Sequence, residues 1–293
     1  MKSASCCAVP VLAGMLALPY AAAADARFGI EVDLGRDSNV NRAADLRRAD
    51  EFVDLEGYAA RSFQTGYRSG LVLRAALRGR EYFAYSDLSN IGLSGRVAWR
   101  IQPTPGYSNP WFEAAFSAEG LRFRDSAIRD GAIVSATVSA GSWFTDRLRG
   151  VAGAGYDHRI ATEGEVYDLK NPKLWASIDW RATDALTVYG TGTLIDGQQV
   201  VTVMNWTGSA WTGGYSGASY SAWARDPVFA RGNERFTAYR VDARTTVLEL
   251  GLHWAVTGTQ AIDVSATRYA AKADNGPTYD GYLVRAGWIY RFR

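Results

Sequence analysis

Residues 280–293 read DGYLVRAGWIYRFR, and their side chains alternate between two kinds. A period of two predicts a β-strand. An apolar face with aromatic residues, backed by arginine and glycine, suits a wall with hydrocarbon on one side and water on the other. The stretch therefore predicts one strand of a membrane-spanning barrel. Its two faces carry Tyr282, Val284, Ala286, Trp288, Tyr290 and Phe292, against Gly281, Leu283, Arg285, Gly287, Arg291 and Arg293.

Twelve segments of the chain are candidates for such strands, an even number, as single-chain bacterial barrels require. The links between them alternate: most links after odd-numbered segments are long and polar, and most after even-numbered segments are short, with 86–88 and 103–109 as the exceptions. Barrels of this class have short turns at one rim and longer loops at the other. The sequence thus predicts an all-β fold, a transmembrane antiparallel up-and-down β-barrel of about 12 strands. The expected strands are 27–37, 51–64, 68–85, 89–102, 110–124, 131–144, 148–161, 173–182, 185–196, 236–256, 261–271 and 280–293.

The chain ends in an aromatic-x-Phe pattern, Tyr290-Arg291-Phe292, followed by Arg293. This ending resembles the closing strand of bacterial outer-membrane β-barrel (porin-like) proteins, where the barrel assembly machinery reads the signature. The resemblance implies a protein of the Gram-negative cell outer membrane. It also implies contacts with outer-membrane lipid and lipopolysaccharide.

The segment Asp37-Ser38-Asn39-Val40-Asn41 closes the first expected strand. It resembles the D-x-N-V-N turn of barrels linked to exopolysaccharide operons and of surface lipoprotein assembly modifiers, which implies a role in export or surface display. A purely structural interpretation is an Asx turn, in which Asp and Asn side chains bond nearby backbone. A Ca²⁺ site at Asp37 is a less favoured alternative, and we expect no metal and no cofactor.

Residues 1–24 have the features of a secretory signal peptide: Lys2, an apolar run over 8–20, and four alanines before residue 25. Both cysteines, Cys6 and Cys7, fall in it, so the barrel domain at 25–293 is expected to hold no disulfide. After residue 24 no run reaches the roughly 18–20 apolar residues that a membrane helix requires. The formal net charge of +2 offers no concentrated basic face for nucleic acid.

The polar side chains of the expected strands should line the barrel lumen. The first two strands are acidic on this face, the next two are basic, and the last strand adds two arginines that we expect to face Glu31 and Asp33 across the join between the chain's two ends. One interpretation is a pore whose charged walls select a polar solute. The alternative is that paired charges simply fill a narrow lumen. The residues are Glu31, Asp33, Asp54, Glu56, Arg74, Arg78, Arg80, Arg96, Arg100, Arg285 and Arg291, with further lumen charges such as Glu113, Glu119, Glu249 and Asp263.

The longest link, 197–235, spaces large aromatic residues among glycine and serine. Such residues could stack on sugar rings, lie among lipopolysaccharide chains or fold inward to constrict the lumen, since long loops are often functional. The alternative is that part of the link is a hairpin extending above the membrane. The aromatic residues are Trp206, Trp211, Tyr215, Tyr220 and Trp223.

Together these features predict an outer-membrane porin-like barrel with both termini in the periplasm, for passage, export or surface presentation of a polar solute or saccharide. A closed structural or adhesive barrel and a lipid-modifying enzyme are the alternatives. An enzyme would need a histidine with a serine or carboxylate partner near the outer rim. Only His158 and His253 are available, and no G-x-S-x-G motif is present. We therefore expect no catalytic residues.

Overall fold

The computed structural model describes residues 26–206, 220–230, 234–274 and 278–292, and most of them lie in β-strands. The expected signal peptide with Cys6 and Cys7, and also Trp211 and Tyr215, lie outside the described residues. No helix in the described ranges is long and apolar enough to cross a membrane. The strands are β1 (Ala26–Asp37), β2 (Asp50–Gly66), β3 (Ser69–Tyr82), β4 (Asn90–Ile101), β5 (Trp111–Phe123), β6 (Gly131–Trp143), β7 (Leu148–Ala161), β8 (Leu169–Arg181), β9 (Leu186–Trp206), β10 (Tyr220–Asp226), β11 (Glu234–Ala255), β12 (Gln260–Ala273) and β13 (Thr278–Phe292), with 3₁₀ turns η3 (Ser86–Leu88), η4 (Ala127–Arg129) and η5 (Pro227–Phe229).

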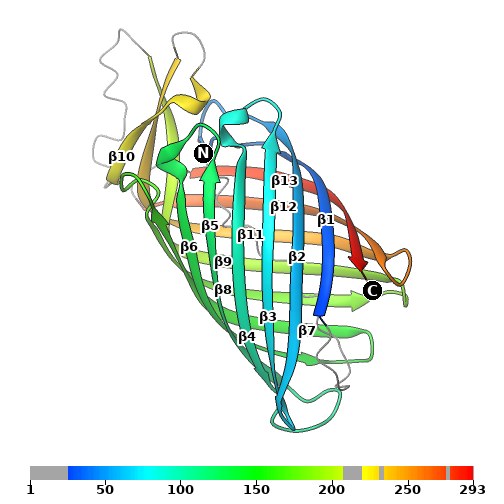
Figure 1. The fold of residues 1–293 in the computed structure, drawn as a ribbon. Coiled ribbons are helices and arrows are strands. Elements are labelled where there is room, and N and C mark those ends of the chain that lie inside the picture. The colour runs from blue at the N-terminus through cyan, green and yellow to red at the C-terminus, as the bar shows by residue number, and fades with distance from the viewer. Residues whose placement is uncertain (1–25, 207–219, 231–233, 275–277, 293) are drawn as a thin grey trace.

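All strands but β10 form a closed antiparallel barrel (Figure 1). Each barrel strand pairs with its neighbour in the chain, β9 pairs with β11, and β1 pairs with β13. β10 pairs with β11 alone and lies beyond the ring. The predicted twelve-stranded up-and-down barrel is confirmed.

The join between β1 and β13 runs from Phe28 opposite Phe292 to Asp37 opposite Leu283. β13 also pairs with β12, so neither of its edges is free. The start of β1 and the end of β13 therefore lie at the same rim, which we call the terminal rim. The opposite rim, which carries most of the long links, is called the loop rim.

The expected and observed strand bounds differ most around the longest link. β9 continues to Trp206 instead of ending at residue 196, and β10 occupies part of the expected loop. With the start of β11 these segments form an extension beyond the loop rim, at the upper left of Figure 1. The expected strand end at residue 196 is wrong, and the alternative that part of the link 197–235 is a hairpin is confirmed. The run Val200–Val203 lacks alternation because side chains on both faces of β9 are buried here.

Outward-facing side chains form an apolar belt around the barrel. Leu93 and Leu250, for example, are 66% and 70% exposed. A water-soluble protein rarely exposes a continuous apolar surface of this extent, whereas a transmembrane barrel presents such a band to lipid. The barrel therefore spans a membrane. Other members of the belt are Leu34, Leu55, Leu77, Phe116, Val138, Leu174, Leu194, Leu248 and Val284.

Leu250→Arg is expected to destabilise the barrel in lipid vesicles by about 2–4 kcal/mol, because a cation within the hydrocarbon layer loses its water. The free energy of unfolding in urea measures the effect. Leu46→Arg is the matched control, since Leu46 is also exposed but lies in the link between β1 and β2. Equal stability of the two variants would contradict the assignment of the belt to lipid.

Candidate functional site in the lumen and at its mouth

The predicted lumen arginines of β3 and β4 form ion pairs with carboxylates of β2 and β5. The acidic β2 adjoins the basic β3, as the sequence indicates. All of these charges lie on the side of their strands opposite to the apolar belt, because side chains alternate along a strand. The pairs are Arg80–Asp54 (Nε to Oδ1, 2.6 Å), Arg74–Glu56, Arg78–Glu119 (3.1 Å), Arg96–Glu113 (2.9 Å) and Arg100–Glu113 (2.8 Å).

These lumen pairs keep some contact with solvent. The side chains of Arg78 and Glu119 are 16% and 21% exposed, and that of Arg96 is 26% exposed. Fully buried ion pairs suffer a large desolvation penalty, which partial hydration reduces. The lumen therefore offers both signs of charge in a partly hydrated environment.

The join between β1 and β13 matches the predicted charge pairing only in part. Arg285 Nε lies 3.9 Å from Asp33 Oδ1, which is too long for a hydrogen bond. Arg291 instead lies close to the hydroxyl group of Tyr58 on β2. Among the described residues Glu31 has no ion pair within 4.0 Å. The expectation that Arg291 neutralises Glu31 or Asp33 is wrong, because its side chain turns toward β2 instead.

Acidic residues are in excess on the lumen wall formed by β1 and β2. Glu31 stands opposite Glu56 and Asp33 opposite Asp54 in the register of β1 and β2. The β2 member of each pair is already bound by an arginine of β3, so the surplus negative charge falls on β1. Like charges directly opposite one another repel, so the carboxyl groups of Glu31 and Asp33 on β1 are the least compensated acidic groups on this wall.

Neither histidine forms a catalytic arrangement within the described chain. His253 Nδ1 lies 3.4 Å from Asp263 Oδ2, and Tyr189 donates its hydroxyl hydrogen to Asp263 Oδ1 at 2.9 Å. The hydroxyl thus bonds the carboxylate and not the histidine, whereas an activated nucleophile must contact its base. His158 Nε2 lies 3.0 Å from Asp168 Oδ1, and its side chain is on the outward-facing side of β7.

The loop-rim mouth of the lumen is covered by residues 38–49, which link β1 to β2. Asn39, Val40 and Asn41 have no exposed surface at all. Val40 belongs to a buried cluster that joins the lumen faces of β2 and β3 to η5 and β11, so the link crosses the mouth. The other buried members of the cluster are Phe52, Tyr82, Tyr85, Leu88, Val228, Phe229 and Phe236.

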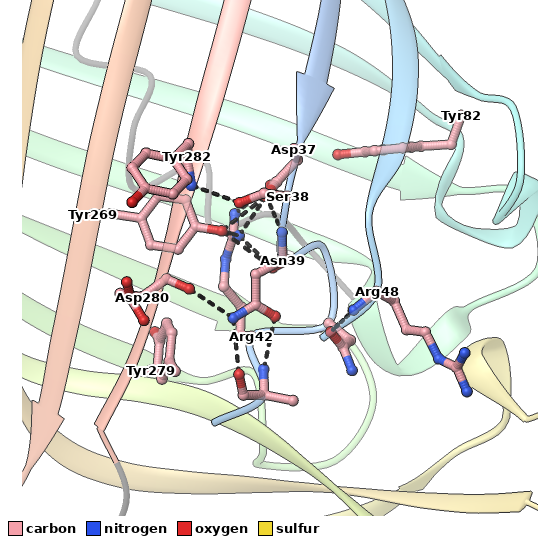
Figure 2. A network of polar contacts seen from close by, with 12 residues as sticks. Asp37, Ser38, Asn39, Arg42, Arg48, Tyr82, Tyr269, Tyr279, Asp280 and Tyr282 are labelled. Carbon is pink, nitrogen blue, oxygen red and sulfur yellow. Dashed lines mark hydrogen bonds and ion pairs between the residues drawn. The ribbon is translucent and has the colours of Figure 1, made fainter. Parts of the chain in front are cut away.

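Asp37 anchors this covering link (Figure 2). It accepts the backbone N–H of Asn39 at 3.0 Å, which confirms the predicted Asx turn. The Arg42 guanidinium reaches its Oδ2 at 2.9 Å, and the Tyr269 hydroxyl of β12 donates to its Oδ1 at 2.8 Å. Burial opposes the charged form of Arg42, but Asp37 raises the pKa of Arg42 well above its ordinary value. We call Asp37, Asn39, Arg42 and Tyr269 the mouth latch.

The two asparagines of the motif bind backbone groups that the fold would otherwise bury unpaired. Asn39 donates to the carbonyls of Ala43 at 2.8 Å and of Asp280 on β13 at 2.9 Å. Asn41 accepts the N–H of Arg48 at 2.9 Å. Because protein donors occupy the oxygens of Asp37, the structure gives the Ca²⁺ alternative no support.

Sequence reasoning missed Arg42 and Tyr269. One signal for Tyr269 was available, because it stands directly opposite Gly281 in the register of β12 and β13. Its ring lies so close to Gly281 that any side chain there would collide with it. An aromatic residue opposite a glycine is a recognisable cross-strand pair, but its partner Asp37 is 232 residues away in the chain.

Asp37→Asn is expected to loosen the covering link, because it leaves the buried Arg42 charge without its carboxylate, a change that costs about 3–5 kcal/mol in buried pairs. Trypsin should then cut after Arg42 at least tenfold faster than in the wild type. Glu51→Gln is the control, since Glu51 pairs with Arg36 at an exposed position where ion pairs contribute little. Equal cleavage rates in the wild type and Asp37→Asn would contradict the latch.

The barrel resembles solved outer-membrane proteins in fold. An outer membrane channel from Pseudomonas putida F1 matches 93% of this chain with 97% of its own, at 10% identity and a TM-score of 0.52. The KdgM porin in complex with disordered oligogalacturonate matches 90% of this chain with 99% of its own, at 10% identity and a TM-score of 0.46. An outer membrane phospholipase dimer from Salmonella typhi matches 93% of each chain, at 11% identity and a TM-score of 0.42.

No protein-family model matches the sequence, and no curated protein matches it. At such low identity the similarity to solved structures concerns the fold alone. The chain has the fold of an outer-membrane β-barrel.

Proposed function

We propose that this protein is a gated outer-membrane channel for a polar solute or saccharide, with both termini in the periplasm and the loop rim at the cell surface. The observation that carries the proposal is the partly hydrated, charge-lined lumen inside a barrel whose exterior is apolar. A purely structural barrel is stable without such charges, because apolar side chains can fill a narrow lumen with no desolvation penalty.

The covered mouth makes this channel a gated one. The link 38–49 is held by hydrogen bonds, ion pairs and the apolar contacts of Val40, without any covalent tie among the described residues, and its polar partners lie on β11, β12 and β13. These polar groups can exchange their contacts for water when the link leaves the mouth. In this proposal the covered mouth corresponds to the closed state, so the wild-type channel should conduct rarely.

The lumen also indicates which ions are favoured once the mouth is open. Each arginine of β3 binds its own carboxylate and the two arginines of β4 share Glu113, whereas Glu31 and Asp33 of β1 lack such close partners. Replacing arginines with acids would extend the negative charge to both walls. Ionic selectivity in channels follows such rings of lumen charge.

Planar-bilayer recordings test the proposal. A variant with residues 40–47 replaced by Gly-Gly-Ser should open at least tenfold more often than the wild type, because the covering segment is gone. In that background, Arg78→Glu with Arg96→Glu should shift the reversal potential in a salt gradient toward cation selectivity.

Arg124→Glu is the control for the charge reversal, since Arg124 pairs with Glu81 at an exposed position outside the lumen. It should leave the reversal potential unchanged. Insertion of each variant is checked by its heat-dependent migration on gels. A properly inserted variant with the shortened link that passes no current would overturn the channel proposal.

A further inference from the structure

The extension formed by β9, β10 and β11 has two unlike faces. On one face, Ala222 and Ala224 of β10 pack against a buried cluster that includes Val166 and Tyr167 from the link between β7 and β8. The opposite face of β10 and β11 carries two exposed aromatic rings. Trp223 is 60% exposed and Tyr220 is 44% exposed. One side of the extension is thus packed, and on the other side the rings of Trp223 and Tyr220 remain accessible to a ligand.

The register brings the aromatic residues together on this exposed face. Trp223 stands directly opposite Tyr239 of β11. A β-bulge after Tyr220 shifts the register, and places Tyr220 on the same face instead of the packed one. The rings of Tyr220 and Tyr239 meet edge to face with centroids 5.2 Å apart.

Two arginines complete the face. Arg225 follows Trp223 at the next same-face position and stands opposite Thr237. Arg235 lies two residues from Thr237 on β11, so it shares that face. Both arginines are exposed, and neither forms an ion pair among the described residues. Their positive charge is therefore available to an anion.

The nearby acidic residues do not neutralise these arginines. Asp226 and Glu234 alternate to the other side of their strands, where Asp226 binds Arg129 and Glu234 binds Arg48. The exposed face therefore combines aromatic rings with positive charge and has no carboxylate in its described part between residues 220 and 241.

The packed side keeps this face rigid. Arg240 donates to the carbonyls of Glu165 at 2.7 Å and Asp168 at 2.9 Å, and also to Ser221 Oγ at 2.7 Å. Because β10 and β11 are fixed before a ligand arrives, little conformational entropy is lost on binding.

We propose that Tyr220, Trp223, Arg225, Arg235 and Tyr239 form a binding site for an anionic saccharide. Aromatic side chains are rigid and amphipathic, and they suit the flat, partly apolar face of a sugar ring. Guanidinium groups bind carboxylate or sulfate by paired, charge-assisted hydrogen bonds. The inference rests on the proposed function, and it assigns a solute class to the channel.

Isothermal titration calorimetry on the full chain in detergent tests the site with two matched probes, a β-1,4-mannuronate hexasaccharide and the neutral β-1,4-mannohexaose. The anionic probe should bind at least tenfold more tightly. Trp223→Ala should weaken binding of the anionic probe at least tenfold, while Trp223→Phe retains most of it. Arg225→Gln with Arg235→Gln should reduce binding of the anionic probe to the level of the neutral one.

Arg244→Gln is the control, because Arg244 is an exposed arginine of β11, like Arg235, but lies on the other face of that strand. It should leave both affinities unchanged. Failure of the anionic probe to bind, or equal binding by the wild type and Trp223→Ala, would overturn the site. The outcomes are separable, since a barrel that conducts without binding contradicts only the saccharide site, and one that binds without conducting contradicts only the channel.

Discussion

Closure of the strand ring through β1 and β13 is the constraint on which the rest of the structure depends. Within lipid, each backbone N–H and C=O needs a partner inside the protein, so an open sheet edge cannot persist there. The pairing from Phe28–Phe292 to Asp37–Leu283 removes the two edges that the chain ends would leave. Closure also divides the side chains into an apolar outer set and an inner set that is free to be polar.

The inner set is organised by local neighbours more than by chemical symmetry across the lumen. Most arginines of β3 and β4 bind carboxylates on the adjacent strand, where cross-strand distances suit direct contact, and Arg78 of β3 reaches past β4 to Glu119 of β5. Arg285 at the join is 3.9 Å from the nearest oxygens of both Asp33 and Glu249. One guanidinium is therefore shared loosely between two carboxylates, and the wall remains acidic. A solute in the proposed channel would meet tightly paired charges on one side and weakly compensated ones on the other.

The strands could be predicted from the sequence because lipid imposes one apolar side on each of them, as residues 280–293 illustrate. The same rule fails where lipid is absent. Val200–Val203 is covered on both faces above the loop rim, and its lack of alternation between apolar and polar side chains hid a strand. The mouth latch was also hidden, because Asp37 and its neighbours have the composition of an ordinary solvated turn. Their burial depends on Tyr269, which no local pattern connects with them.

The covering link, residues 38–49, and the extension pack against each other. Opening of the proposed channel therefore requires one of the two to move. Phe229 and Phe236 at the extension belong to the same buried cluster as Val40 of the covering link. Arg48 of the link also forms an ion pair with Glu234 at the start of β11. The extension is held from its other side by Arg129–Asp226, a pair with no exposed surface, and by the buried cluster under the β7–β8 link.

The covering link lacks buried contacts on a second side comparable to those of the extension. It is tied to β12 and β13 mainly by the polar contacts of Asp37, Asn39 and Arg42, which water can replace. Moving the extension would expose apolar surface and an unpaired buried charge, both at high free-energy cost. Moving residues 38–49 exposes the apolar side chains of Val40 and Ala43 with the surface that they cover, and otherwise mostly polar groups that water can solvate. In the proposed channel the link is therefore the element that moves and the extension is its fixed support, so a saccharide bound on β10 and β11 would remain in place while the mouth opens beside it.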